Sequence, residues 1–148
     1  MKKLLFAMAA VLSLLVSCGK ENKDEDYGLF KEPILTWGAS QADIISQLGT
    51  PETQTDDILK YINEKDNVEY VYHFWDNKLI ESRVYLPYSV PFEDIIAFLK
   101  EKYVYRDEFS GEDYAYFNTK DGKNTIWTEP DVMGARGIAY SKNDGDPL

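Results

Sequence analysis

A helical spacing of apolar residues occurs twice in this chain, at an offset of 51 residues. The first pattern begins at Ser40, a favourable N-cap residue with Asp43 three positions later, and ends before Gly49 and Pro51. The second pattern follows Ser89. At this offset the apolar positions of the two helices coincide: Ile44 with Ile95, Ile45 with Ile96 and Leu48 with Leu99.

Runs rich in aromatic and β-branched residues follow each helix and favour strands. Turn signals at Asp76-Asn77 and Asp121-Gly122 divide these runs into antiparallel hairpins. The expected strands are 58–62, 68–75 and 79–86 after the first helix, and 103–109, 114–118, 125–128 and 137–141 after the second.

This order predicts an α+β domain over residues 29–148, made of two helix-then-meander repeats at about 36–86 and 89–142. The two repeats would form one antiparallel sheet, with both helices covering the same face. Because alternate residues of a strand point to opposite faces, Val68, Tyr70, Tyr72 and Phe74 should face the core.

Residues 37–51, Trp-Gly-Ala-Ser-Gln-Ala-Asp-Ile-Ile-Ser-Gln-Leu-Gly-Thr-Pro, resemble the opening of SmpA/OmlA-type lipoprotein domains. In that family a glycine, a capping residue, a helix and a Gly-x-Pro stop precede a small meander. The doubled unit is similar to the β-lactamase-inhibitor-protein-like fold, which contains two such repeats. Both resemblances imply a domain that binds or scaffolds other proteins and is not an enzyme.

The N-terminus has the parts of a secretory signal, with Lys2 and Lys3 followed by an apolar stretch at 4–16 that is shorter than the roughly 20 residues needed to cross a bilayer. Ser17 then precedes Cys18, the only cysteine. This run resembles the lipobox of bacterial lipoproteins, which implies cleavage between Ser17 and Cys18 and lipid on the cysteine. We therefore predict a signal peptide at 1–17 and attachment to the outer membrane of a bacterial cell envelope. An ordinary signal peptide with a chance cysteine, or an uncleaved anchor helix, is the alternative.

Residues 18–28 are acidic and almost free of apolar side chains, which predicts a flexible tether. The acidic cluster also resembles the export signal of surface-exposed lipoproteins in Bacteroidetes-type bacteria. A plain spacer is the equal alternative, so the sequence leaves open whether the domain faces the periplasm or the cell surface.

Removal of residues 1–17 leaves 14 basic and 26 acidic side chains, a formal charge of −12. Such a charge argues against a nucleic-acid partner, because phosphate binding needs a cationic surface. The lone cysteine excludes an internal disulfide and a zinc site of His and Cys type. No sequence signal indicates a cofactor, a metal or an oligomeric state.

Catalytic patterns are missing from the sequence as well. His73 is the only histidine and lies within an expected strand, a position more typical of structural residues than of a general base. No Gly-x-Ser-x-Gly elbow and no phosphate-binding glycine loop occur. We therefore predict no catalytic residues and a protein that is not an enzyme.

Aromatic side chains are abundant, and a sheet covered on one face has to present some of them outward. By strand alternation Trp75 and Tyr85 lie on the same side as His73 and Arg83. These four residues form the predicted binding surface. The leading hypothesis is a protein-binding or scaffold module at the envelope, with an envelope protein as partner. The alternative is a carbohydrate-binding or carbohydrate-processing accessory that uses exposed aromatic residues and carboxylates.

Overall fold

The computed structural model of this chain describes residues 28–112 and 114–145. The expected signal peptide, the Ser17-Cys18 cleavage and lipidation site, and the tether up to residue 27 lie outside these residues. They stay predictions from the sequence.

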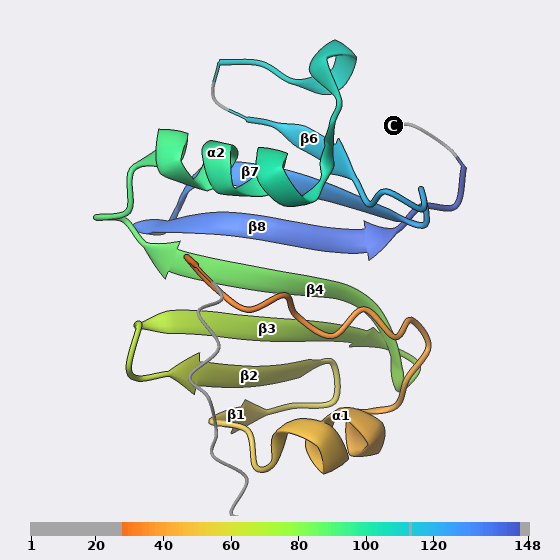
Figure 1. The fold of residues 1–148 in the computed structure, drawn as a ribbon. Coiled ribbons are helices and arrows are strands. Elements are labelled where there is room, and N and C mark those ends of the chain that lie inside the picture. The colour runs from red at the N-terminus through yellow and green to blue at the C-terminus, as the bar shows by residue number, and fades with distance from the viewer. Residues whose placement is uncertain (1–27, 113, 146–148) are drawn as a thin grey trace, which may run out of the picture.

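One open antiparallel sheet of eight strands and two α-helices form the domain (Figure 1). The expected α+β class is therefore confirmed. The strand order is β1-β2-β3-β4-β8-β7-β6-β5, so β4 and β8 pair at the centre and the outermost strands have two residues each. In chain order the elements are α1 (Gln41–Leu48), β1 (Thr53–Gln54), β2 (Ile58–Asn63), β3 (Val68–Trp75), β4 (Lys78–Pro87), α2 (Phe92–Lys102), β5 (Val104–Tyr105), the 3₁₀ helix η1 (Asp107–Phe109), β6 (Tyr116–Asn118), β7 (Asn124–Val132) and β8 (Ala135–Lys142).

Helix α1 begins and ends where its local signals predict. The Ser40 hydroxyl accepts a hydrogen bond from the backbone N–H of Asp43 at 3.2 Å, and the Asp43 carboxylate accepts one from the Ser40 N–H at 2.9 Å. This capping box satisfies two N–H groups at the helix start. Gly49 ends the helix with a φ of 84°, a conformation that glycine adopts without steric cost.

Helix α2 follows Ser89 as expected but has no side-chain cap at its start. Its N-cap residue is Pro91, which provides no side-chain hydrogen bond, and Ser89 lies in the turn before it. The fixed φ of proline and the acidic Glu93 and Asp94 in the first turn favour a helix start at this point. The helix then continues to Lys102, three residues longer than α1.

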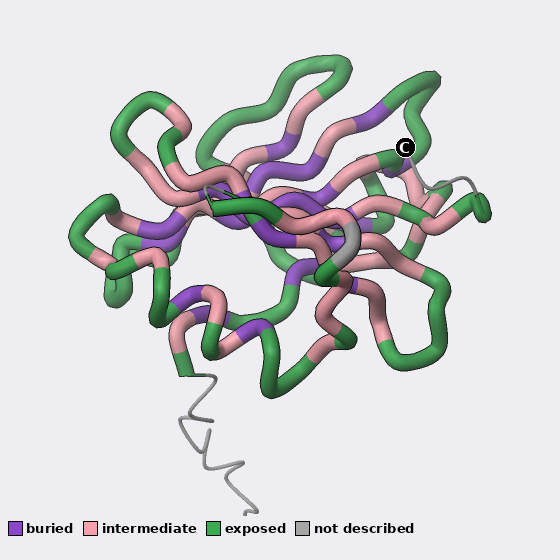
Figure 2. The backbone as a smooth tube through the Cα atoms, turned by 90° about the horizontal axis from the view of Figure 1, so that it is seen from above, coloured by how far each residue is buried: buried purple, intermediate pink, exposed green. Residues whose placement is uncertain are grey.

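Buried apolar side chains form two clusters, a smaller one within the first half of the chain and a larger one that joins residues of both halves. Trp37 and Tyr70 contact both clusters. Figure 2 shows the buried positions along the middle of the strands, with exposed positions at the loops and turns. The first-half cluster consists of Ile44, Leu59, Tyr72, Phe74 and Leu79, and the larger cluster includes Val84, Leu86, Ile95, Leu99, Phe117, Ile126, Ile138 and Tyr140.

The segment 29–38, which we call the N-terminal strap, runs lengthwise over β3 and β4 (Figure 1). The fully buried hydroxyl of Ser82 donates a hydrogen bond to the Ile34 carbonyl at 2.7 Å. Phe30 packs into the larger cluster, and the N–H of Gly38 bonds to the Leu79 carbonyl at 2.9 Å. The strap thereby covers part of the core without being a strand of the sheet.

The expected strand at 103–109 is wrong beyond its first residues. Only Val104 and Tyr105 pair with β6, and the polar residues that follow turn into η1. The run 106–108, Arg-Asp-Glu, lacks the β-branched side chains that favour extended backbone. The chain therefore leaves the sheet here and returns at Tyr116.

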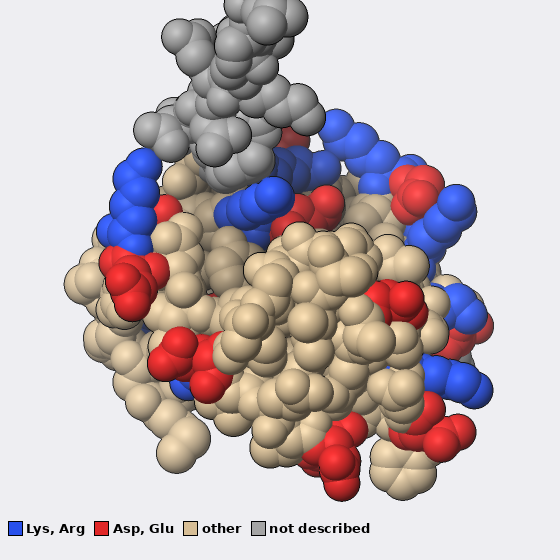
Figure 3. Space-filling view, turned by 90° about the horizontal axis from the view of Figure 1, so that it is seen from below, with Lys and Arg blue, Asp and Glu red and all other residues tan. Residues whose placement is uncertain are grey.

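Figure 3 views the end of the molecule that carries α1 and β1. Acidic and basic side chains are interspersed on this end, and neither sign forms a continuous patch there. Over the described ranges, no helix is both long and apolar enough to cross a membrane.

Candidate functional site

His73, Arg83 and Tyr85 project from one face of the sheet, opposite to the buried side chains of Tyr72 and Val84. Cross-strand pairing places residues of β7 and β8 on the same face, since Arg83 is opposite Ala139 and Ala139 is opposite Trp127. We call this side the Arg83 face. It carries His73, Glu81, Arg83 and Tyr85 from the first half and Tyr116, Trp127, Glu129 and Ser141 from the second.

Arg83 is the centre of a hydrogen-bonded group on this face. Its Nε donates to Glu81 Oε1 at 2.5 Å, and its Nη1 donates to Glu129 Oε2 at 3.2 Å and to the Tyr85 hydroxyl at 3.4 Å. Burial works against the charged guanidinium, but the hydrogen bonds to Glu81 and Tyr85 outweigh it and raise the pKa of Arg83. The guanidinium is therefore charged and held in one orientation.

Glu129 reaches Arg83 from two strands away, across β8. This contact requires a small residue on the intervening strand, and Gly137 occupies that position opposite Glu129. A Cβ at Gly137 would lie 3.0 Å from Glu129 Oε2 and 3.2 Å from the Glu129 Cβ. The absence of a side chain at Gly137 thus allows the carboxylate to extend over β8.

His73 lies at the margin of the same group, with its Nε2 3.9 Å from Glu81 Oε1. Burial lowers the pKa of His73, and the nearby Glu81 opposes that effect. Ser141, the hydroxyl residue on the next strand, is opposite Glu81, so Glu81 stands between it and His73. Two strand spacings amount to roughly 10 Å, too far for a histidine to take a proton from a serine. The geometry suits a rigid charged surface rather than acid-base chemistry.

Trp75 is on the same strand as His73 but beyond a β-bulge, near the β3–β4 turn. Its side chain is 76% exposed, and it borders a hollow of about 470 Å³ with Gln41, Asp57 and Asn77. Of the four residues predicted for the surface, Arg83 and Tyr85 are hydrogen-bonded to each other and His73 lies close to their partner Glu81. Trp75 lies at the edge of this group. Sequence reasoning missed Glu81 and Glu129 as partners of Arg83. Glu81 is two positions away on the same strand, so strand alternation could have identified it. The contact with Glu129 depends on strand order.

A second hollow, of about 820 Å³, lies farther along the Arg83 face at β6, β7 and β8. Its floor consists of strand residues from this face, and the segments around η1 and after β8 form its walls. Aromatic and uncharged polar side chains dominate the lining, which includes Phe109, Tyr114, Tyr116, Asn118, Thr125, Trp127 and Ser141.

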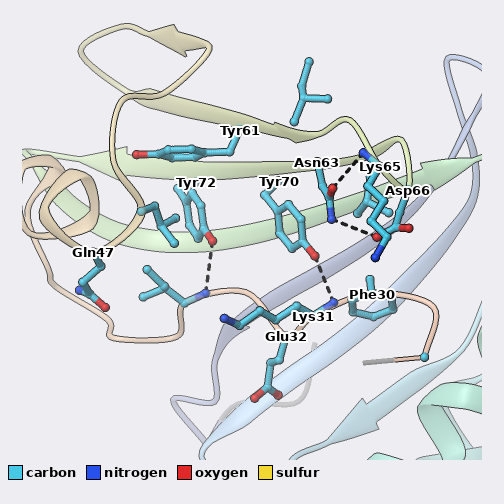
Figure 4. A pocket seen from close by; sticks show the side chains of 15 residues that line it. Phe30, Lys31, Glu32, Gln47, Tyr61, Asn63, Lys65, Asp66, Tyr70 and Tyr72 are labelled. Carbon is cyan, nitrogen blue, oxygen red and sulfur yellow. Dashed lines mark hydrogen bonds between the residues drawn. The ribbon is translucent and has the colours of Figure 1, made fainter. Parts of the chain in front are cut away.

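A third cavity, of about 700 Å³, lies between the strap, α1 and the β2–β3 hairpin (Figure 4). Tyr61, Tyr70 and Tyr72 line it, and each tyrosine hydroxyl is used by the protein itself. Tyr70 and Tyr72 accept hydrogen bonds from the Lys31 and Ile34 N–H groups at 3.1 and 3.4 Å. Tyr61 donates to the Gly49 carbonyl at 3.0 Å. These tyrosines hold the strap and the end of α1 in place.

Within residues 28–112 and 114–145, no group of three or more His, Cys, Asp or Glu side chains could hold a metal ion. No family model, curated protein or solved structure matches this chain.

Proposed function

We propose that this chain is a bacterial envelope lipoprotein, held to the outer membrane by lipid on Cys18, whose α+β domain binds another protein and catalyses no reaction. We further propose that the domain consists of two repeats, one from α1 to β4 and one from α2 to β8, with both helices on the face opposite to the Arg83 face. The Arg83 face is then open to a partner.

The order of elements supports the two repeats. Each half of the chain runs from one helix through four strands, and the sheet order of the second half mirrors that of the first about the β4–β8 pair. Ile44 and Ile95, which the 51-residue offset aligns, are both fully buried. Ile44 packs with strand residues of the first half, and Ile95 packs in a cluster that includes strand residues of both halves.

The observation that carries the binding proposal is the Arg83 group beside the exposed Trp75. Arginine, tyrosine and tryptophan are the residues that dominate protein interfaces energetically. Glu81 and Glu129 already fix the Arg83 guanidinium, so binding would cost little additional side-chain entropy. The exposed indole of Trp75 offers apolar area at the edge of this group, near the β3–β4 turn.

The edges of the sheet are less suited to a partner than its face. Both outer strands, β1 and β5, have only two residues, which limits the backbone groups available for pairing with another chain. A partner is therefore expected to bind across the Arg83 face through side chains.

Proximity labelling by the full-length protein in its own cell tests this proposal. Trp75→Ala and Arg83→Ala should each lower labelling of the partner about tenfold or more, since interface residues of these types commonly contribute that much. Met133→Ala is the matched control, because Met133 is fully exposed at the β7–β8 turn and should leave labelling unchanged. Equal labelling by all four forms would contradict binding at this face.

The anchor is tested in the same cells by Cys18→Ser. The variant should leave the membrane fraction while its circular dichroism and thermal unfolding stay those of the wild type. A Cys18→Ser protein that remained membrane-bound would exclude lipid on this residue as the anchor.

A further inference from the structure

We propose that the 820 Å³ hollow on the Arg83 face is a binding site for an uncharged saccharide. This site is separate from the Arg83 group and does not depend on the protein-binding proposal. Its volume lies within the range typical of small-molecule sites, about 300–1,000 Å³.

The polar groups of the hollow are the first evidence. Among the described residues, the Trp127 indole N–H and the hydroxyls of Tyr114, Tyr116, Thr125 and Ser141 make no hydrogen bond. All five belong to the lining of one cavity. The tyrosines of the 700 Å³ cavity differ, because each of their hydroxyls bonds to the protein backbone. Hydroxyl and indole groups gathered in one hollow match a ligand that carries many hydroxyl groups.

The aromatic rings are the second evidence. Tyr114 and Tyr116 meet edge to face at 5.9 Å between ring centroids, and Tyr116 is opposite Trp127 across the β6–β7 pair. Such rings present flat apolar surfaces beside their polar groups, as a sugar ring presents C–H groups between its hydroxyls. Stacking of a pyranose on these rings would leave its hydroxyls directed to the polar lining.

The charged side chains of the hollow are engaged by other groups of the protein, which favours an uncharged ligand. Lys142 pairs with Asp144 at 2.9 Å at the rim. Arg106 donates to Asn118 Oδ1 at 2.9 Å and lies over the Phe109 ring, with 5.0 Å from Cζ to the ring centroid. These contacts hold the Arg106 guanidinium against the wall of the hollow.

Gly111 allows the Tyr114 ring to take its place in the wall. A Cβ at Gly111 would lie 2.9 Å from Tyr114 Cε1, closer than real side chains approach. The Gly111 N–H also bonds to the Tyr114 carbonyl at 2.9 Å. The wall is thus formed before a ligand binds, which reduces the entropy lost on binding.

The test is a panel of neutral glycans on an array, followed by calorimetric titration of the detergent-solubilised full-length protein with each glycan that binds. We expect binding of at least one neutral glycan. Trp127→Ala and Tyr114→Ala should weaken it about tenfold or more, since each removes one stacking ring. Tyr88→Ala is the matched control, because Tyr88 is an exposed tyrosine outside the hollow, and the glycan affinity of this variant should equal that of the wild type.

Tyr114 is 48% exposed, so its substitution leaves the fold intact and keeps the test valid if the half-buried Trp127 proves necessary for folding. Three outcomes would overturn the proposal: no binding of any neutral glycan, binding of acidic glycans alone, or equal affinity in Tyr114→Ala and wild type. A loss of protein labelling in the Arg83→Ala protein has no bearing on this site.

Discussion

The two helices of this domain share an apolar pattern but bury it to different extents. Helix α2 buries both Ile95 and Leu99 completely, whereas α1 buries Ile44 and leaves Leu48 42% exposed. Leu48 is the final residue of α1, and Gly49 and Pro51 prevent a further turn. The same spacing of apolar residues therefore produces unequal cores because the helices differ in length.

The shorter length of α1 leaves a cavity beside the core of the first half. Leu48 lines the 700 Å³ cavity together with Tyr61 and Tyr72, and residues of the strap form another side of it (Figure 4). In the second half Leu99 and Ile95 belong to the larger cluster, which extends from Phe30 to Tyr140. One additional turn of helix thus separates a filled core from a partly open one.

The largest expected effect comes from truncating the aligned leucines. Leu99→Ala should lower the free energy of unfolding by about 3 kcal/mol, because it leaves a cavity in a fully buried site. Leu48→Ala should lower it by less than about 1 kcal/mol, since nearly half of that side chain is already in water. Urea denaturation measures the free energy of unfolding of both variants. Equal losses in the two variants would refute the comparison of the two halves.

Removal of the cap from α1 should have an intermediate effect. Ser40→Ala deletes the hydroxyl that accepts the Asp43 N–H and should cost about 1 kcal/mol of stability. Ser89→Ala, at the residue expected to precede α2, should change stability by less than about 0.5 kcal/mol because Ser89 is exposed and caps nothing. A larger loss of stability from Ser89→Ala than from Ser40→Ala would contradict the conclusion that Ser40 caps α1 and that Ser89 caps no helix.

Local signals made the helices and most strands predictable. The capping box and the stop of α1 fall within ten residues, from Ser40 to Gly49, so no distant contact is needed to place them. Alternation along β3 likewise predicted which residues face the core, and Tyr72 and Phe74 are buried as expected. The exposed Leu48 was less predictable, because its burial depends on what packs over the last turn.

A contact between residues far apart in the sequence explains why Glu129 was not predicted as part of the candidate site. The pairing of Arg83 with Glu129 joins residues 46 positions apart, and it exists because β8 lies between β4 and β7 with Gly137 at the crossing point. Neither the strand order nor this role of a glycine is encoded in a local pattern. A small residue on a central strand, opposite a carboxylate, is the sequence signal that indicates such a contact.

The smallest effect should be a pH dependence that arises in the first half alone, because His73 is the only histidine. Burial lowers the pKa of His73, with Glu81 and Asp57 opposing and Arg83 assisting. The unfolded chain then binds a proton more readily than the folded chain. The stabilising contribution is therefore complete above the ordinary pKa of about 6.5 and is lost as the pH falls toward the lower, folded value.

His73→Gln should reduce the loss of stability between roughly pH 7.5 and 5.5 by a few tenths of a kcal/mol, a small value because solvent screens a side chain that is 32% exposed. Urea midpoints of wild type and variant at both pH values measure the change. Groups that do not contact His73 contribute equally in both proteins and cancel in this comparison. If His73→Gln loses as much stability as the wild type on acidification, the pH dependence does not originate at the Arg83 face.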